Sequence, residues 1–218
     1  KYGGFEDFRG GGHFSGRITA ALVAAGAIVI KALENKGIYI GTHIKSCHGV
    51  QDRSFENYEE DIKFLNRDRF PVLENREAIE AEILKAASEG DSVGGVLETA
   101  VVNMPAGTGE PWFDTVEGLI AHNIFSIPAV KGIEFGAGFS VAEMRGSEAN
   151  DGFFYEGDKI ITKSNNNGGI NGGISNGMPV VFRTAIKPTP SIYKQQDTVD
   201  LNKKENAKLV IQGRHDPA

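Results

Sequence analysis

The sequence contains a single cysteine, shows no excess of positive charge and has no long apolar run. Because Cys47 is alone, the chain cannot form an internal disulfide, which fits a reducing compartment. The formal net charge of -6 argues against a general nucleic-acid-binding protein, because such proteins usually carry a strong basic excess. No uninterrupted apolar run approaches the roughly 20 residues that span a bilayer, and nothing resembles a signal peptide. These absences predict a soluble cytoplasmic protein that binds neither nucleic acid nor membrane.

Metal ligands are also scarce. His43, Cys47 and His48 lie close together in the sequence, but only His43 and Cys47 would share a strand face, and no second ligand pair stands out. We therefore predict no metal site. A local basic pocket is still compatible with the acidic composition, since net charge describes the whole surface and not one site.

Glycine, by contrast, is abundant. It accounts for 28 of 218 residues, about 13 per cent, compared with roughly 7 per cent in average proteins. With 40% hydrophobic residues and no collagen-like period, a chain of this length can bury a sizeable core. We expect residues 1–218 to form a single core domain. The chain begins without an initiator Met and stops just after a cluster of charged residues, so we also expect a fragment truncated at both ends.

Hydrophobic periodicity predicts a mixture of helices and strands. Apolar residues almost surround the helix predicted over 16–37, which follows Ser15 as its N-cap, so we expect this helix to be buried. Residues 49–73 are polar and irregular and predict an excursion over the surface. Because the alternation of elements lacks regular βαβ spacing, it favours an α+β layered fold. The other predicted helices cover 75–90 and begin near 112, and the predicted strands cover 38–47, 92–105, 132–144, 158–162, 179–187 and 208–212.

The first stretch that suggests chemistry is "FRGGGHFSGRITA", residues 8–20. Three glycines, a hydroxyl and an arginine at a helix start supply exposed N–H groups, the positive end of a helix dipole and a cation, a combination suited to an anion. The spacing matches neither a P-loop nor a dinucleotide-binding fingerprint. The alternative interpretation is a flexible turn followed by a well-capped helix.

The second stretch is "SNNNGGINGGISNGMPVVFRTAIKPTPS", residues 164–191. Asparagine and glycine tolerate left-handed backbone conformations and form compact polar loops. The strand that follows alternates so that Arg183 and Lys187 share a face, and Thr189 and Ser191 offer hydroxyls in a turn stiffened by prolines. We favour a ligand site here over a surface hairpin with solvated charges.

The third stretch is "GRHDP", residues 213–217, where Arg214, His215 and Asp216 are adjacent. Such a trio can bind an anion or hold an acid/base group. The alternative is that these neighbouring charges simply meet solvent.

Several long segments follow one another in the order found in a known family. They are "YGGFEDFRGGGHFSGRITAALVAAGAI", "EGDSVGG", "PAGTGEPWFD", "SIPAVKGIEFGAGF", "RGSEAND", "SNNNGGINGGISNGMPVVFRTAIKPTPSI" and "GRHDP". Through these segments the chain resembles the chorismate synthases from one end to the other.

The resemblance implies an enzyme of the shikimate pathway of aromatic amino acid biosynthesis, a carbon–oxygen lyase. Its reaction would be a 1,4-anti elimination that converts 5-enolpyruvylshikimate 3-phosphate to chorismate and phosphate. Reduced FMN would be the cofactor, with NADPH involved only indirectly, in reducing the flavin. The resemblance also implies a β-α-β sandwich subunit and a homotetramer. Because substrate and flavin both carry phosphate, loops with N–H groups and cations suit the implied ligands.

The same resemblance transfers ligand positions motif by motif. Arg17 and Arg9, in the first motif, become candidates for binding the phosphate or carboxylate of the substrate. The flavin-binding positions would be His13, Phe14, Ser15, Pro128, Ala129, Gly172, Lys187, Pro188, Thr189, Pro190, Ser191 and Arg214.

This sequence departs from the family pattern in two respects. The commoner first motif has Arg-Ser-Ser where this chain has His13-Phe14-Ser15, and a Glu where it has Ile18, so one cation and one hydroxyl are missing from the expected site. The motifs that hold the two catalytic histidines of the family are absent from these 218 residues, and no residue here receives a catalytic role. We expect the full-length protein to be a chorismate synthase and this chain alone to be inactive.

Other functions share some of these features. A flavin reductase or a phosphosugar-binding enzyme would also use anion-binding loops, and NADPH oxidation without phosphate release would favour the reductase. A non-catalytic core fragment would bind neither FMN nor substrate. Ligand binding and phosphate release therefore distinguish these alternatives.

Overall fold

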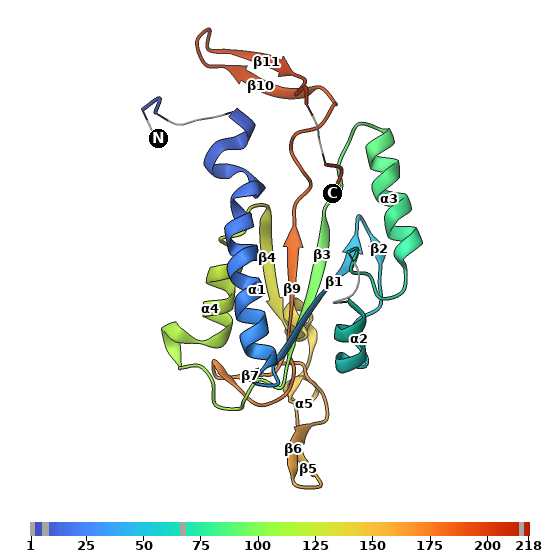
Figure 1. The fold of residues 1–218 in the computed structure, drawn as a ribbon, viewed down its shortest axis with the longest axis vertical. Helices are drawn as coiled ribbons and strands as arrows, with labels where there is room; N and C mark the ends of the chain where they lie inside the picture. The colour runs from blue at the N-terminus through green and yellow to red at the C-terminus, as the bar shows by residue number, and fades with distance from the viewer. Residues whose placement is uncertain (1–2, 6–8, 66–68, 214–215) are drawn as a thin grey trace.

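The structure, a computed structural model, describes residues 3–5, 9–65, 69–213 and 216–218. Its centre is a five-stranded sheet with strand order β2-β1-β3-β9-β4, in which every neighbouring pair is antiparallel (Figure 1). The strands of this sheet are β1 Tyr39–Cys47, β2 Val50–Gln51, β3 Gly95–Val102, β4 Val130–Phe135 and β9 Val180–Ile186.

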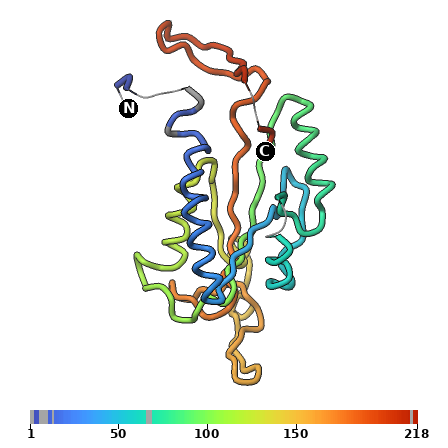
Figure 2. Tube along the Cα trace, viewed as in Figure 1, coloured from blue at the N-terminus to red at the C-terminus, as the bar shows by residue number. Residues whose placement is uncertain are grey.

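Three further hairpins extend from the sheet. The β10–β11 hairpin projects at one end of the long axis and the β5–β6 hairpin at the other, as the trace in Figure 2 shows. Their strands are β5 Phe153–Glu156 with β6 Lys159–Thr162, β7 Ile170–Asn171 with β8 Ile174–Ser175, and β10 Gln196–Asp200 with β11 Glu205–Leu209.

Helices cover parts of both faces of the sheet. Successive residues of a strand point to opposite faces of the sheet. Ala100 of β3 packs against α2 on one face, and Phe182 of β9 packs with α4 on the other. A third cluster of buried residues joins α3 to the end of β1. The helices are α1 Ala20–Glu34, α2 Tyr58–Leu65, α3 Arg76–Ser88, α4 Val116–Ile124 and α5 Gly146–Ala149, with 3-10 turns η1 Arg9–Phe14, η2 Gly16–Thr19, η3 Trp112–Asp114 and η4 Gly138–Glu143.

The α+β class is confirmed, and three predicted elements differ. Residues 49–73 contain α2, whose Ile62 and Leu65 are buried. The strand predicted over 132–144 ends at Phe135, because Gly136 and Gly138 adopt positive φ and η4 follows. The last strand lies over 205–209 instead of 208–212.

The prediction that the first long helix is buried is wrong. No residue of α1 is buried, and Leu22, Val23 and Ile28 are 55%, 69% and 75% exposed. The segment Gly16–Glu34 is long and apolar enough to cross a membrane by length and composition alone. An apolar pattern indicates that a helix packs against another surface, but it does not identify that surface.

The chain exposes more surface than a compact protein of its size. Its accessible surface is 14744 Å², whereas a folded monomer of 23.4 kDa is expected to expose about 9,700 Å². The uncovered α1 and the projecting hairpins contribute to this surface (Figure 1). The exposed apolar side chains of α1 favour contact with another protein surface.

Candidate functional site

Two of the predicted ligand segments lie together at one end of the sheet. The end of β9 lies beside the start of β4, because these strands are antiparallel neighbours. The Lys187 amide donates a hydrogen bond of 3.0 Å to the Ala129 carbonyl, which joins residues 128–129 to residues 187–191. Ala129 has a φ of 73°, a conformation that is uncommon for residues other than glycine.

The 187–191 segment is held mainly through its backbone. The Ser92 hydroxyl donates to the Thr189 carbonyl at 2.6 Å, and the Gln196 side chain donates to the Pro190 carbonyl at 3.1 Å. Because these contacts use main-chain oxygens, they fix the course of the segment without engaging the side chain of Lys187, which is exposed. A cation and two hydroxyls, those of Thr189 and Ser191, are thereby presented on a fixed backbone.

The first motif forms the two 3-10 turns that lead into α1. Ser15 is the N-cap of η2, as predicted, and its Oγ accepts from the Arg17 amide at 3.3 Å. Phe14 and Arg17 are exposed. Figure 1 shows these turns toward the same end of the long axis as the end of β9. For Arg9 and His13 the structure describes the backbone alone, and Arg214 lies outside the described residues.

Asp151 fixes the asparagine-rich loop, residues 164–179, which precedes β9. Its carboxylate accepts four hydrogen bonds of 2.7–2.8 Å, from the Ser164 hydroxyl, the amides of Asn166 and Asn167, and the Asn167 side chain. Burial opposes ionisation of this carboxyl, but the hydrogen bonds, first among them that from Ser164, outweigh it and lower the pKa of Asp151. One buried carboxylate thus fixes two consecutive asparagines, Asn166 and Asn167, and the Ser164 hydroxyl.

The paired glycines of the loop are needed for close backbone contacts. Gly168 has a φ of 61°, and a Cβ on it would lie 2.5 Å from the Gly136 nitrogen. A Cβ on Gly169 would lie 2.5 Å from the Pro179 carbonyl oxygen. These glycines therefore let the loop dock on the turn after β4 and on the residue that precedes β9.

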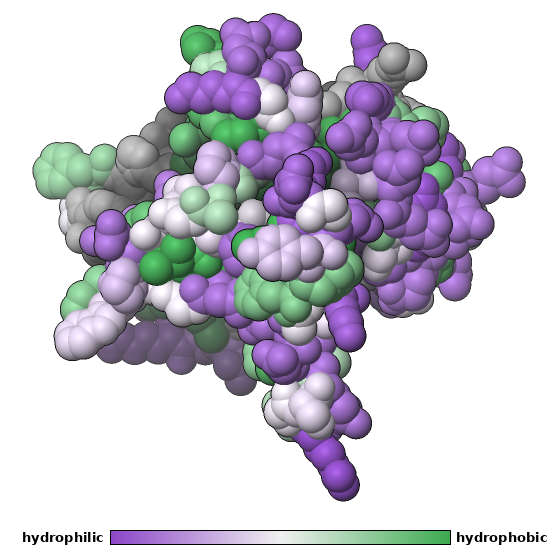
Figure 3. Space-filling model, turned by 90° about the horizontal axis from the view of Figure 1, so that it is seen from below, coloured by the Kyte–Doolittle hydropathy of each residue, from purple (hydrophilic) through white to green (hydrophobic). Residues whose placement is uncertain are grey.

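Gly172 lies at the opposite end of β9 from residues 187–191. Its loop precedes β9 while the other segment follows it, and seven strand residues span about 20 Å. Figure 1 places β7 near this end, which Figure 3 shows from below with apolar and polar side chains interspersed at the surface. Gly172 is exposed, with a φ of 59° and no atom within 4 Å of a Cβ built on it. In one copy of the chain, Gly172 therefore lies a strand length away from residues 128–129 and 187–191.

A row of alternating charges crosses four strands, a feature that the sequence analysis did not identify. His43 of β1, Glu98 of β3, Arg183 of β9 and Glu134 of β4 are partners in register. His43 Nε2 lies 3.1 Å from Glu98 and its Nδ1 lies 3.2 Å from Asp52. The Arg183 guanidinium lies 3.8 Å from Glu98 and donates to Glu134 at 2.7 Å. Period-two alternation showed which residues of each strand share a face. It could not show which strands pair, because these strands lie far apart in the sequence.

The carboxylates of this row are stabilised in their charged form. For Asp52, burial raises the pKa, but hydrogen bonds from the backbone amides at 73–75 outweigh it and lower the pKa. For Glu98, burial is likewise outweighed, by the hydrogen bond with His43 and one from the Phe55 amide, and the pKa is lowered. The His43 ring thus lies between two buried carboxylates, with one carboxylate oxygen near each ring nitrogen.

His48 and Cys47, the other two candidate metal ligands, both lie near Glu82. His48 Nδ1 lies 2.7 Å from Glu82. Cys47 is buried, and that burial together with nearby Glu82 raises the pKa of its thiol. Among the residues that the structure describes, no three His, Cys, Asp or Glu side chains are placed to hold a metal ion.

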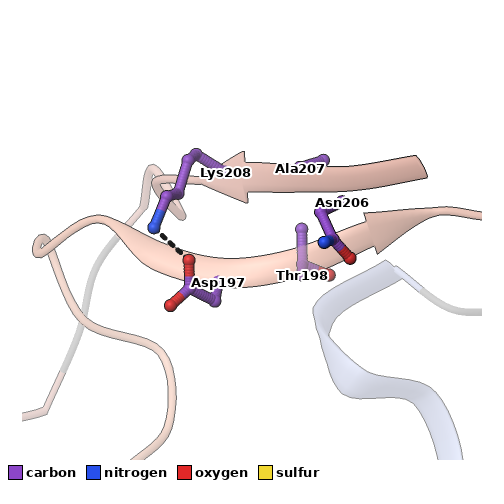
Figure 4. Close-up of a pocket in the computed structure, with 5 residues that line it drawn as sticks. All are labelled: Asp197, Thr198, Asn206, Ala207 and Lys208. Atoms are coloured by element: carbon purple, nitrogen blue, oxygen red, sulfur yellow. Dashed lines mark hydrogen bonds and ion pairs between the residues drawn. The ribbon is translucent and has the colours of Figure 1, made fainter.

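Two hollows lie away from the predicted positions. One, of about 460 Å³, lies on the β10–β11 hairpin beside the Asp197–Lys208 ion pair (Figure 4). The other, of about 210 Å³, lies on the sheet beside Glu134 and Arg183. Of the residues in the predicted ligand stretches, only Arg183 and Ala185 line either of these hollows in the described part of the chain.

Comparisons with known proteins give a consistent result. A family model described as "Chorismate synthase" matches residues 1–218. Proteins named chorismate synthase from Korarchaeum cryptofilum and Dehalococcoides mccartyi are 47% and 50% identical over 218 and 217 residues, or 100% and 99% of this chain. The chain spans 60% of the length of each of these two relatives. A solved structure described as "Crystal Structure of Chorismate Synthase" matches this chain at 38% identity and a TM-score of 0.73. The match covers 81% of this chain and 57% of the chain in that structure.

Proposed function

The chain belongs to the chorismate synthase family, and from that premise we propose that the protein converts 5-enolpyruvylshikimate 3-phosphate to chorismate and phosphate by 1,4-anti elimination. The observation that supports this proposal is a family match over all 218 residues together with a shared structure. The fold of this chain matches that of the solved structure at a TM-score of 0.73, and the complete subunit would be a β-α-β sandwich. The full protein would act as a cytoplasmic homotetramer.

We propose reduced FMN as the cofactor, held at the end of the sheet where residues 128–129 and 187–191 meet. The donor set suits a phosphorylated ligand, because an exposed ammonium from Lys187 and hydroxyls from Thr189 and Ser191 lie on a backbone fixed by Ser92 and Ala129. When bound, the reduced flavin would supply electron density as phosphate leaves, and NADPH would serve only to reduce it. The proposed flavin contacts also include His13, Phe14, Ser15 and Arg214.

The residues of this chain would bind and orient, and none would transfer a proton. Arg17 lies in η2, the 3-10 turn that precedes α1 and that Ser15 caps. Its exposed guanidinium would favour an anion. We assign Arg17 and Arg9 to the phosphate or carboxylates of the substrate. Holding substrate and flavin in one orientation lowers the barrier by removing the need for them to meet by diffusion.

Gly172 is a separate element of the proposal. Because it lies a strand length from residues 187–191, a contact with the same flavin would require its loop to come from another copy of the chain or the ligand to extend along the sheet. Its open surroundings would let a planar ligand approach the backbone. Substituting Gly172 therefore tests this position independently of the others.

The test is chorismate formation by the full-length protein. Purified protein with 5-enolpyruvylshikimate 3-phosphate and reduced FMN is expected to release phosphate and form chorismate, which absorbs in the ultraviolet. NADPH oxidation without phosphate release would instead indicate a flavin reductase. We propose that the 218-residue chain alone is inactive, and chorismate formation by it would contradict that part.

A further inference from the structure

The asparagine-rich loop contains three Asn-Gly pairs, at 167–168, 171–172 and 176–177. An asparagine followed by glycine is prone to spontaneous loss of its side-chain amide, because the next backbone nitrogen can attack Cγ without obstruction by a Cβ. The three pairs lie within eleven residues of one another, so they share solvent and temperature but differ in local contacts. They therefore allow an internal comparison.

Hydrogen bonds protect Asn167 from this reaction. Its Nδ2, the leaving group, donates to Asp151 at 2.8 Å, and its own amide donates to the same carboxylate oxygen. The attacking nitrogen would be that of Gly168, which is buried and donates to the Asn165 carbonyl at 3.0 Å. Reaction at Asn167 would require these hydrogen bonds to break first.

Asn176 is held as well. Its Oδ1 accepts from the Met178 amide at 2.9 Å, its Nδ2 donates to Asn171 at 2.7 Å, and its backbone amide donates to the Gly169 carbonyl. Both ends of the side-chain amide are therefore engaged, and the residue is only partly exposed.

Asn171 has the opposite environment. Asn171 and Gly172 are both exposed, and they lie at the turn of the β7–β8 hairpin, which has only two residues in each strand. Its Oδ1 accepts from Asn176 Nδ2 at 2.7 Å, and in the described part of the chain its Nδ2 has no hydrogen-bond partner. A donor on Oδ1 stabilises the negative charge that develops there when Cγ is attacked.

We propose that Asn171 is a site of spontaneous deamidation in the folded protein, and that Asn176 promotes the reaction through its hydrogen bond to Oδ1. The Gly172 nitrogen loses its proton to solvent hydroxide and forms a bond to Asn171 Cγ. The Cγ–Nδ2 bond breaks, and Nδ2 leaves as ammonia after taking a proton from water. One water molecule then opens the cyclic imide at either carbonyl and leaves aspartate or isoaspartate, so the net change is one water consumed and one ammonia released.

The product places a new negative charge, and in the isoaspartate form one extra backbone carbon, directly before Gly172. The proposal does not depend on the assignment of Gly172 to flavin. If that assignment holds, aged protein would bind the anionic flavin more weakly than fresh protein.

The experiment is incubation of the folded full-length protein at 37 °C and mildly alkaline pH, followed by peptide mass spectrometry and isoaspartate-specific methylation. Because Asn167 is tied to a charged partner, Asn171 is expected to react about tenfold or more faster than Asn167, and also faster than Asn176. The same chain unfolded in urea provides the control, in which the three rates should become comparable. Equal rates in the folded protein, or an unchanged ranking after unfolding, would overturn the proposal.

Two variants separate the contacts. Asn176→Ala should slow reaction at Asn171, because the donor to Oδ1 is lost, and an unchanged or higher rate would refute the promoting role. Asp151→Asn should raise the rate at Asn167, since the leaving group is released. If that variant unfolds, the wild-type comparison in native and unfolded protein still decides the proposal.

Discussion

At the scale of single residues, buried carboxylates hold the polar parts of this protein in place. Asp52, Glu98 and Asp151 are each no more than 3% exposed, and each accepts hydrogen bonds from backbone amides. Burying a charge without such partners is unfavourable. The pKa of each carboxyl is lowered because its hydrogen bonds and neighbouring charges outweigh the effect of burial. The folded state therefore depends on these groups remaining ionised.

This dependence predicts acid sensitivity. A carboxyl whose pKa is lower in the folded than in the unfolded state stabilises the fold above its unfolded pKa, about 4 for Asp and Glu. That stability is lost as the pH falls from about 4 through the lower folded pKa. The free energy of unfolding, measured by urea titration at several pH values, should fall steeply below about pH 4, and less steeply in the Glu98→Gln variant.

Glu98→Gln should also destabilise the protein at neutral pH. The substitution keeps the shape but removes the charge between His43 and Arg183, so we expect a loss of about 3–5 kcal/mol in the free energy of unfolding. Glu89→Gln, at an exposed position, is the matched control and should change stability little. Equal effects of the two substitutions would contradict the assigned role of the charge row.

At the scale of elements, the sequence predicted most of the long helices and strands but not what they contact. Alternation in β1 and β9 was sufficient to predict both strands, and Ser15 was sufficient to predict a cap. α2 was missed because polar Glu59 and Glu60 mask its apolar side. The burial of α1 was predicted wrongly, because periodicity carries no information about the partner.

The glycines of the asparagine-rich loop allow a paired test. Gly168 and Gly172 have nearly the same positive φ, 61° and 59°, but a Cβ would clash with backbone only at Gly168. Gly172→Ala should cost only the backbone strain, about 1–2 kcal/mol of unfolding free energy. Gly168→Ala should cost about 1–3 kcal/mol more, measured by urea denaturation. Equal costs would show that close approach of the backbone is not the reason for glycine at 168.

At the scale of the whole molecule, the candidate site could be predicted only in part. Motifs along the chain identified Ala129 and Lys187, and the antiparallel pairing of β4 and β9 brings them into contact. The same strand separates Gly172 from them, which no local pattern could have shown. The charge row depends on the register of four strands that are distant in sequence.

The large exposed surface makes a prediction about α1. In the 218-residue chain alone, where no residue of α1 is buried, its amides should exchange with solvent almost as fast as in a marginal isolated helix. In the full-length protein, additional chain or other copies should cover the helix and slow exchange by several orders of magnitude. Hydrogen exchange with mass spectrometry measures both, and equal protection of α1 in the two would contradict the proposed cover.

The charge row also bears on how the sheet assembles. A slip of one residue in β9 would move Arg183 to the face that holds Phe182 and would leave Glu98 and Glu134 without their shared cation. Misregistered pairings are therefore penalised by uncompensated charge, whereas apolar residues alone would tolerate several alignments. In folding terms, the row selects one alignment of β1, β3, β9 and β4 from among many compact alternatives.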